Sequence, residues 1–356
     1  MSFKLFELML KIGTLLAITP TSPSVNESET IRRKLYALLV VATLAAGVVF
    51  SSTALNFYRD SFGLLRLILY QNDLILSVLS FYVITSYTFW KRRQWTELVR
   101  KLEASAKMVQ MDKTGECTLL HYVFLVLSHA VFFAVITYKM YSWYQIHGYG
   151  VVKWYNVRVA EEYICFFYVI LLATLVNTFR EMYKRLNRNL ALWLAREGEL
   201  GAVVRKTGFV CCFLKETVNV FNDLFGWPIF FLVGHVTHQI LLYAFFAIWN
   251  KTNSLEVSSN ALAVLVMLFL TLTSFFICDN ARQEAEKLVA LSYKLRWSQA
   301  LGQARKQELY ELTNLILNNM PKFSGANFFD IEKATLLNIL ASVGSTLVLL
   351  VQFSDK

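Results

Sequence analysis

Seven long segments without a charged residue recur along the chain, separated by stretches in which charged residues are frequent. The uncharged segments are 35–58, 74–90, 117–138, 163–179, 224–250, 257–278 and 334–354. Each is close to the length of about 20 residues that a helix needs to cross the hydrocarbon core of a bilayer. Because backbone groups in lipid must be satisfied within the segment, these runs predict helices and not open strands. The pattern predicts an all-α protein with seven transmembrane helices.

The composition agrees with a membrane protein and excludes an ordinary soluble one. Hydrophobic residues make up 56% of the 356 residues and charged residues only 17%, with a mean hydropathy of +0.45. Soluble domains are nearer to about 45–50% apolar and about 25% charged. The net charge of +10 belongs to the connections between the apolar segments. Such loops face anionic membrane lipid, so the charge does not require a nucleic-acid partner.

The position of the basic residues predicts how the chain crosses the membrane. Most of the 35 Lys and Arg residues lie in the N-terminal segment and in the connections after the second, fourth and sixth apolar segments. Cytoplasmic loops are enriched in these residues. We therefore expect a multi-pass plasma-membrane protein with a cytoplasmic N-terminus, an extracellular C-terminus and long cytoplasmic helices. This orientation is the reverse of that of a G-protein-coupled receptor.

The last apolar segment carries an ordered polar stripe. Its members share one face of a helix by their spacing of three, four, three and seven residues: Thr335, Asn338, Ser342, Ser345 and Gln352. Periodicity alone favours packing against another helix. A pore-lining helix repeated around an axis would explain the stripe better, with Leu349 as an apolar constriction and Gln352 as a neutral polar ring.

Two motifs in the last third of the chain resemble those of insect gustatory receptors. The end of the chain, from Ser345 and Thr346 through five hydrophobic residues to Gln352 and Phe353, is similar to the family signature of Thr-Tyr, five hydrophobic residues and Gln-Phe. It follows the run Gly-Ala-Asn-Phe-Phe-Asp at 325–330, as in the family. A second motif, Asn-Asp-Leu-Phe-Gly-Trp-Pro at 222–228, stands at the start of the fifth apolar segment.

The resemblance implies a gustatory receptor that acts as a ligand-gated, nonselective cation channel in the membrane of a sensory neuron dendrite. It implies a homotetramer, or a heteromer with other gustatory receptors, in which the seventh helices line the pore and Gln352 and Phe353 form the gate. Ser345 and Thr346 stand where the family usually has Thr and Tyr. This chain therefore has no residue equivalent to that Tyr, and any role the family assigns to it does not carry over. Leu347 replaces the Glu of the sugar-sensing branch, so a bitter or other non-sugar tastant is expected.

These features divide the chain into four parts. Residues 1–34 are a cytoplasmic amphipathic segment on the membrane surface, because Leu8, Met9 and Ile12 share one helical face while Lys4 and Lys11 lie opposite. The other parts are helices 1–6 with cytoplasmic extensions (35–279), a cytoplasmic helical region between subunits (280–333), and the pore-lining helix with an extracellular C-terminus (334–356).

A small ligand requires a cavity open to the outside, so we expect its lining in the outer halves of the first six helices. The candidate ligand-binding residues are Asn72, Asp73, Tyr138, Tyr163, Phe167, Gln239, Tyr243 and Trp249. Asp73 is the only carboxylate among them and is suited to a cationic ligand, although hydration at the headgroup level would also explain it. His235 and His238 are three residues apart with no carboxylate near in sequence, so no metal site or cofactor is predicted.

Other classes of membrane protein fit less well. A G-protein-coupled receptor has an acidic-Arg-aromatic motif after its third helix and an Asn-Pro element in its seventh, where this chain has Tyr138-Lys139-Met140 and Asn338-Ile339. A transporter is expected to show repeats and broken helices, but Pro228 is the only proline within a predicted span. No sequence motif indicates an enzyme.

Overall fold

The computed structural model describes residues 3–19, 27–52, 63–110, 118–194, 200–249, 254–297 and 302–354. Within these ranges the chain is almost entirely helical. The helices are α1 (Phe3–Leu15), α2 (Glu27–Ser52), α3 (Gly63–Thr85), the short π-helix η2 (Ser86–Trp90), α4 (Arg92–Met108), α5 (Thr118–His147), α6 (Tyr149–Leu194), α7 (Leu200–Trp249), α8 (Ser254–Arg296), α9 (Gln303–Asn318) and α10 (Lys333–Ser354). Two strands of two residues each, β1 (Ser324–Gly325) and β2 (Phe329–Asp330), form an antiparallel hairpin before α10.

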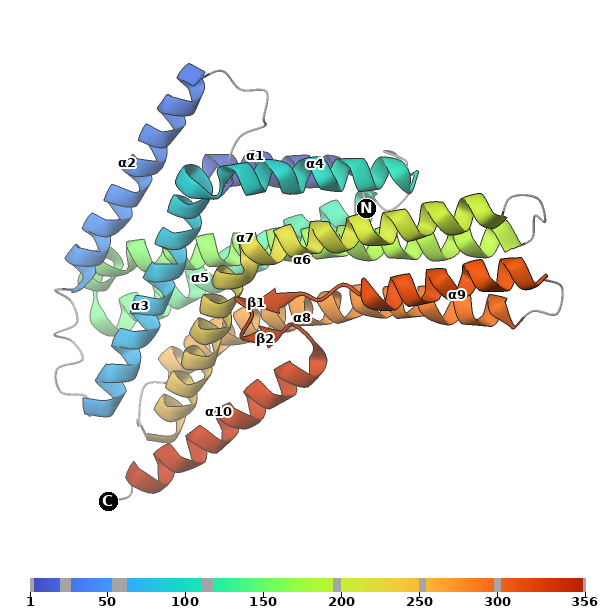
Figure 1. Cartoon of the computed structure of the whole chain (residues 1–356). Coiled ribbons are helices and arrows are strands. Elements are labelled where there is room, and N and C mark those ends of the chain that lie inside the picture. The colour runs from blue at the N-terminus through green and yellow to red at the C-terminus, as the bar shows by residue number, and fades with distance from the viewer. Residues whose placement is uncertain are drawn as a thin grey trace.

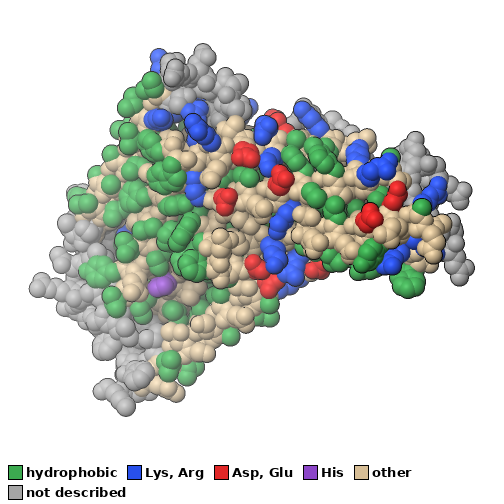
Figure 2. Space-filling view, viewed as in Figure 1, with side chains coloured by type: hydrophobic (Ala, Val, Ile, Leu, Met, Phe, Trp, Pro, Cys, Tyr) green, Lys and Arg blue, Asp and Glu red, His purple; other side chains and the backbone are tan. Residues whose placement is uncertain are grey.

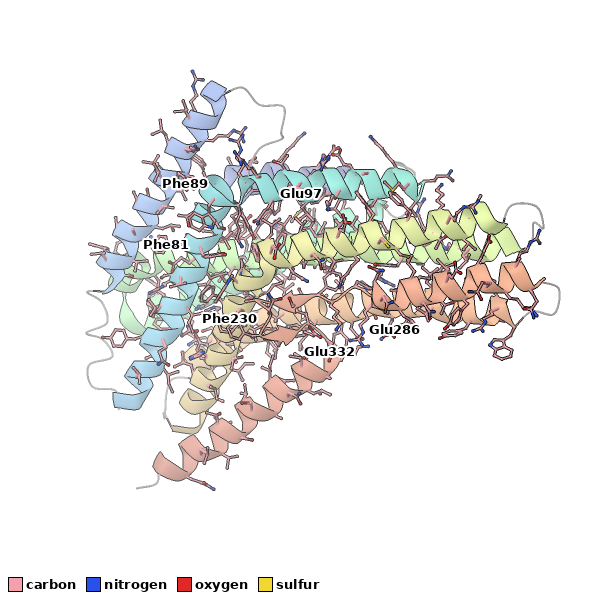
Figure 3. The ribbon with its side chains drawn as sticks, in the orientation of Figure 1. Phe81, Phe89, Glu97, Phe230, Glu286 and Glu332 are labelled. Carbon is pink, nitrogen blue, oxygen red and sulfur yellow. The ribbon has the colours of Figure 1, made fainter. Side chains whose placement is uncertain are left out.

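The helices form a spread bundle that narrows into an arm, as Figure 1 shows. Helices α2, α3 and α10 diverge in the spread half, whereas α9 runs along the arm beside the continuations of α6, α7 and α8. Charged side chains gather over the arm and the start of α2, and hydrophobic side chains are frequent over the rest of the spread half (Figure 2). The labelled residues in Figure 3 follow the same division, with Phe81 and Phe230 in the spread half and Glu286 on the arm side.

The all-α membrane architecture is confirmed. Six described helices are long and apolar enough to cross a membrane, namely α2, α3, α5, α6, α7 and α8, and α10 adds a shorter apolar stretch at Lys333–Leu349. The long cytoplasmic connections expected from the sequence are also helical, because α6 continues to Leu194 and α9 covers Gln303–Asn318.

The helices extend well beyond the uncharged runs. The fourth run, 163–179, lies inside the 46-residue helix α6, and α3 begins at Gly63, before Asp73. A charged side chain does not interrupt the backbone hydrogen bonds of a helix, so the helix continues where its charges find partners. The length of an uncharged run therefore underestimates the length of the helix that contains it.

Helix α6 is the centre of the fold. Its apolar window is 78% buried, and residues 164–172 are buried without interruption. A helix that is apolar on every side must be surrounded by other elements, and α6 contacts α1, α2, α3, α5, α7 and α8. Gly47 on α2 permits one of these approaches, because a Cβ there would lie 2.0 Å from the Val157 side chain.

Helix α1 is amphipathic as expected, and its apolar face is partly buried by the protein itself. Phe6 and Met9 belong to the hydrophobic core, and α1 contacts α5 and α6. The Tyr36 hydroxyl of α2 donates a hydrogen bond of 2.6 Å to the Leu15 carbonyl. The expected ends of this helix, Pro20 and Pro23, lie outside the described residues.

The hairpin before α10 is clamped onto α7. The Asn222 side chain donates to the Lys322 carbonyl at 2.7 Å and accepts from the Ser324 amide at 3.1 Å. A Cβ on Gly226 would lie only 2.8 Å from the backbone nitrogen of Ala326, so the two backbones meet where α7 lacks a side chain. The two sequence motifs at 222–228 and 325–330 thus form one contact, which we call the hairpin clamp.

The turn of the hairpin has an unusual backbone. Ala326 and Asn327 have φ values of 51° and 60°, the left-handed region that Asn tolerates and Ala does not favour. The start of α10 is fixed to α8 beside it by ion pairs of Lys333 with Asp279 at 2.8 Å and of Glu332 with Arg282 at 2.5 Å. The hairpin therefore connects α10 firmly to α7 and α8.

Candidate functional site

A cavity of about 50 Å³ lies among five helices at the end of the bundle away from the arm. It is formed by the N-terminal halves of α3, α6 and α8 and the C-terminal halves of α5 and α7. Its lining residues are Leu69, Asn72, Asp73, Leu76, Lys139, Trp143, Tyr155, Arg158, Glu162, Gln239, Leu242, Tyr243 and Asn260. We call it the polar cavity. Antiparallel helices bring these segments together although Leu69 and Asn260 are 191 residues apart in the chain.

The polar cavity brings together four of the residues predicted from the sequence. Asn72 and Asp73 come from α3, and Gln239 and Tyr243 from one face of α7. Asn72 and Gln239 are buried, with 8% and 6% of their surface exposed. The cavity lies in the halves of these helices that the predicted orientation places toward the outside of the cell.

The other four predicted residues are not among the lining residues of this cavity. Phe167 is fully buried in the core. The Tyr163 ring packs against aromatic rings of α5, at 5.5 Å from Phe133. The Tyr138 hydroxyl forms a 3.0 Å hydrogen bond with the Ser258 hydroxyl. The side chain of Trp249 lies outside the described residues.

A network of ion pairs surrounds the polar cavity. The Arg158 guanidinium contacts the Glu161 carboxylate at 2.7 Å and the Asp73 carboxylate at 3.2 Å, and it also donates to the Ser77 hydroxyl at 2.9 Å. On the α5 side, Lys139 pairs with Glu162 at 2.7 Å. Asp73 is therefore held by a protein partner, which argues against the interpretation that it is simply hydrated at the headgroup level.

Sequence reasoning missed the other charged residues of the network around Asp73. Lys139 directly follows the third uncharged run, and Glu161 and Glu162 directly precede the fourth. In the sequence these charges mark the ends of apolar runs, and a charge at the end of a run does not by itself indicate a site. The useful signal is that opposite charges flank several apolar runs on the same side of the membrane, where they can pair.

Aromatic side chains form one wall of the polar cavity. The Trp143 and Tyr155 rings lie 4.6 Å apart between centroids, and the Trp143 indole donates a 3.2 Å hydrogen bond to the Asn260 side chain. That bond fixes the orientation of the indole ring. The ring is large and rigid, and its N–H is its only polar group. The wall can therefore contact either an apolar or a cationic ligand.

Two side-chain amides of the polar cavity have oxygen atoms without a hydrogen-bond partner within the described part of the chain. They are Asn72 Oδ1 and Gln239 Oε1. A buried polar group without a partner costs about 1–3 kcal/mol. These atoms are therefore suited to accept hydrogen bonds from a bound molecule or from water.

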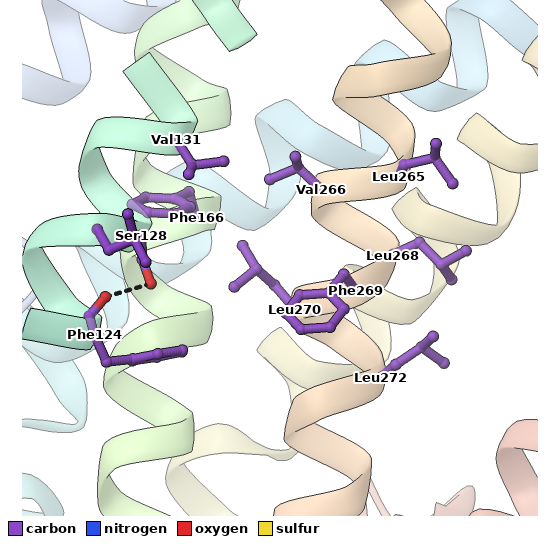
Figure 4. A pocket seen from close by; sticks show the side chains of 11 residues that line it. Phe124, Ser128, Val131, Phe166, Leu265, Val266, Leu268, Phe269, Leu270 and Leu272 are labelled. Atoms are coloured by element: carbon purple, nitrogen blue, oxygen red, sulfur yellow. Dashed lines mark hydrogen bonds between the residues drawn. The ribbon is translucent and has the colours of Figure 1, made fainter. Parts of the chain in front are cut away.

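A second and larger space is apolar and opens outward. It is a groove of about 510 Å³ between α5 and α8, shown in Figure 4. Apart from Ser128 its lining is hydrophobic, and Leu127 and Phe269 are 58% and 63% exposed. Between the groove and the polar cavity lies a gap of only about 10 Å³, which Val266 and the Lys139–Glu162 pair border. The groove lacks the polar groups that would orient a ligand.

The predicted pore residues lie on the exposed side of α10. Asn338, Ser342, Ser345, Leu349 and Gln352 are all exposed in the single chain. The helix packs on α7 and α8, with its residues Leu336 and Val343 buried. Apart from Thr335, which is half-buried, the polar stripe therefore faces away from its own chain. The side chain of Phe353 lies outside the described residues.

Among the described residues no group of three or more His, Cys, Asp or Glu side chains is placed to hold a metal ion. His235 is fully buried, and His238 bonds through its ring to the Gly234 carbonyl at 2.8 Å. The described Cys165, Cys211, Cys212 and Cys278 are not in disulfides.

Comparisons with known proteins agree on one family and one fold. The family model described as "7tm Chemosensory receptor" matches residues 6–356. The structure of the insect olfactory receptor OR5 from Machilis hrabei is similar, with a TM-score of 0.69 and 11% identity over 99% of this chain and 97% of that chain. The same receptor in complex with eugenol gives a TM-score of 0.67 and 13% identity over 98% of each chain. No curated protein sequence matches significantly.

Proposed function

Because the chain belongs to the 7tm chemosensory receptor family, we propose that it is a gustatory receptor that works as a ligand-gated, nonselective cation channel. Several copies, four in the simplest case, surround a central pore lined by α10. The ligand is a small non-sugar tastant, bitter or similar. Leu347 supports the non-sugar assignment, since the sugar-sensing branch has an acidic residue at that position.

The observation that carries the channel proposal is the exposed polar stripe of α10. A bilayer disfavours polar side chains against its acyl chains. The stripe lies opposite the buried residues Leu336 and Val343, so its own chain does not cover it. Copies of the helix around a wet axis would hydrate the stripe and would place Leu349 and Gln352 as successive rings.

The polar cavity is the proposed ligand site. It is enclosed by five helices and lined by aromatic and polar side chains, two of which, Asn72 and Gln239, have amide oxygens without a partner in the described part of the chain. These are the features of small-molecule sites in proteins. In the predicted orientation it lies in the extracellular half of the membrane, where a tastant would arrive.

Helix α7 supports a mechanism that connects the two sites. It carries Gln239 and Tyr243 in the cavity, and Asn222 and Gly226 in the hairpin clamp. A movement of α7 caused by the ligand would therefore reach the hairpin and the start of α10. Shifting a channel from 1% to 99% open requires about 5.5 kcal/mol of differential binding, or about 1.4 kcal/mol for each of four equivalent sites.

Whole-cell recording tests the proposed function. Cells that express this chain, alone and with other gustatory subunits, should give cation currents when a panel of bitter and other non-sugar compounds is applied. Uptake of a radiolabelled compound without current would instead support a transporter. An N-terminal tag that antibody reaches in intact cells would contradict the predicted orientation.

The gate assignment gives a further prediction. Phe353→Ala should raise the basal conductance, because a smaller side chain at the proposed gate widens the pore and favours its hydration. The measurement is the unliganded current divided by the amount of protein at the cell surface.

Leu337→Ala is the matched control for this prediction. Leu337 is 66% exposed on α10 but lies outside the polar stripe. Unchanged basal and ligand-evoked currents in Phe353→Ala would show that the gate is elsewhere.

A further inference from the structure

We propose that the ligand of the polar cavity is a small protonated amine. This inference rests on the function proposed above, because it assigns a ligand class to the same site. It follows from the charge, the hydrogen-bonding groups, the aromatic wall and the size of the cavity.

Among the described side chains, the ion-pair network has one more carboxylate than cations. Three carboxylates belong to it, those of Asp73, Glu161 and Glu162, and they share the two cations Arg158 and Lys139. Lys139 pairs with Glu162 alone, whereas Arg158 divides its contacts between the other two. Uncompensated negative charge in a low-dielectric site favours the entry of a cation.

Of the two carboxylates that share Arg158, Asp73 is the one that a ligand can reach. Its contact with Arg158 is the longer of the two, at 3.2 Å against 2.7 Å for Glu161. Asp73 lines the cavity, and its side chain is 30% exposed while that of Glu161 is fully buried. An ammonium group can therefore contact Asp73 without displacing Arg158 from Glu161.

The remaining groups suit the hydrogens of an ammonium ion. Asn72 and Gln239 both line the cavity, and their buried side-chain oxygens lack hydrogen-bond partners within the described chain. An ammonium ion has donors only, so it can satisfy both oxygens and the carboxylate together. The Trp143 and Tyr155 rings add faces that attract cations.

The volume limits the ligand to a few heavy atoms. The cavity measures about 50 Å³, and a space of about 10–15 Å³ is needed for one water molecule. A short alkylamine fits this space and a polycyclic compound does not. The apolar groove of about 510 Å³ would hold larger molecules, but it offers no carboxylate among its lining residues.

Thermal unfolding of the purified full-length protein tests the ligand class without requiring channel opening. The probes are ethylamine, propylamine and butylamine hydrochlorides, compared with ethanol, propan-1-ol and butan-1-ol in amine-free buffer, with sodium chloride equalising ionic strength. The amines should raise the Tm in a saturable way, and the alcohols of the same shape should not. Equal shifts for amines and alcohols, or no shift with any amine, would overturn the proposal.

Two variants test whether the amines bind in the polar cavity. Asp73→Asn and Gln239→Leu should each weaken the apparent affinity for the amines at least tenfold. Glu286→Gln removes a carboxylate that is 51% exposed on α8 and should leave the affinity unchanged. If Asp73→Asn fails to fold, Gln239→Leu still decides, and an amine affinity that it does not reduce would contradict the site.

Recording on the same protein separates this proposal from the function on which it rests. Stabilisation by amines without current in any subunit combination would support the ligand class and contradict the channel. Currents evoked by neutral compounds, with no stabilisation by amines, would support the channel and overturn the ligand class.

Discussion

Replacing Gly226 by Ala is expected to abolish most of the ligand-evoked current while leaving the protein at the cell surface. The added Cβ would lie 2.8 Å from the Ala326 nitrogen and 3.1 Å from its Cα. Both atoms are backbone, so they cannot move aside as a flexible side chain can. Overpacking of this kind costs about 1–3 kcal/mol, and about 1.4 kcal/mol changes an equilibrium tenfold.

The expected loss comes from the position of Gly226 in the hairpin clamp. The hairpin already holds Ala326 in a left-handed conformation, and it leads directly into α10. Moving it away from α7 would weaken the Asn222 hydrogen bonds and shift the start of the proposed pore helix. The peak current per surface receptor, measured by recording and surface biotinylation, should fall at least tenfold.

Gly234→Ala provides the matched control. It lies on the same helix, and a Cβ there meets no atom within 4 Å. Both substitutions make the same change in helix propensity, so a difference between them reports the contact with Ala326. Equal currents in the two variants would show that the hairpin clamp does not transmit gating.

Replacing Arg158 by Met is expected to be the most destabilising single change in the polar cavity. The substitution leaves Asp73 and Glu161 without their cation, and the Glu161 side chain is fully buried. Removing one member of a buried ion pair costs about 3–5 kcal/mol, because the remaining charge is uncompensated. Thermal unfolding in detergent should show a large fall in the Tm, accompanied by reduced surface expression.

A control pair and a rescue separate the loss of charge balance from a general effect of losing an arginine. Arg205 lies 4.0 Å from Glu308 with side-chain exposures of 76% and 41%, and a surface pair contributes only about 0–1 kcal/mol. Arg205→Met should therefore change the Tm little. Adding Asp73→Asn and Glu161→Gln to Arg158→Met should recover part of the loss. A Tm for Arg158→Met equal to that of Arg205→Met would mean that the network does not stabilise the fold.

The candidate site could be predicted only in part. Polar residues within apolar helices pointed to Asn72, Asp73, Gln239 and Tyr243, because such residues need a partner or a cavity. The same search among aromatic residues selected Phe167, which is buried in the core, and Tyr163, which packs against aromatic rings of α5. Helical periodicity shows which residues of one helix share a face, but it does not show which neighbouring helix that face meets.

The charged residues of the site could be identified only from the tertiary structure. Lys139, Arg158, Glu161 and Glu162 come from two helices joined near Gly148, and Asp73 comes from a third. A charge at the end of an apolar run is compatible with the headgroup region or with an ion pair. Only the approach of α3, α5 and α6 decides between these, since the energy of a pair depends on distance and burial.

The sequence by itself determined the helical membrane architecture, because the cost of exposing backbone groups to lipid leaves the long apolar runs no other structure. It also placed a polar stripe along the last helix, because the helical repeat is a property of the local backbone. The tertiary structure decided that most of this stripe faces away from its own chain and that the motifs at 222–228 and 325–330 touch. It also decided that, among the described residues, three carboxylates share two cations beside one small cavity. These features depend on contacts between segments distant in sequence, and the packing of whole helices, which no local pattern encodes, brings them together.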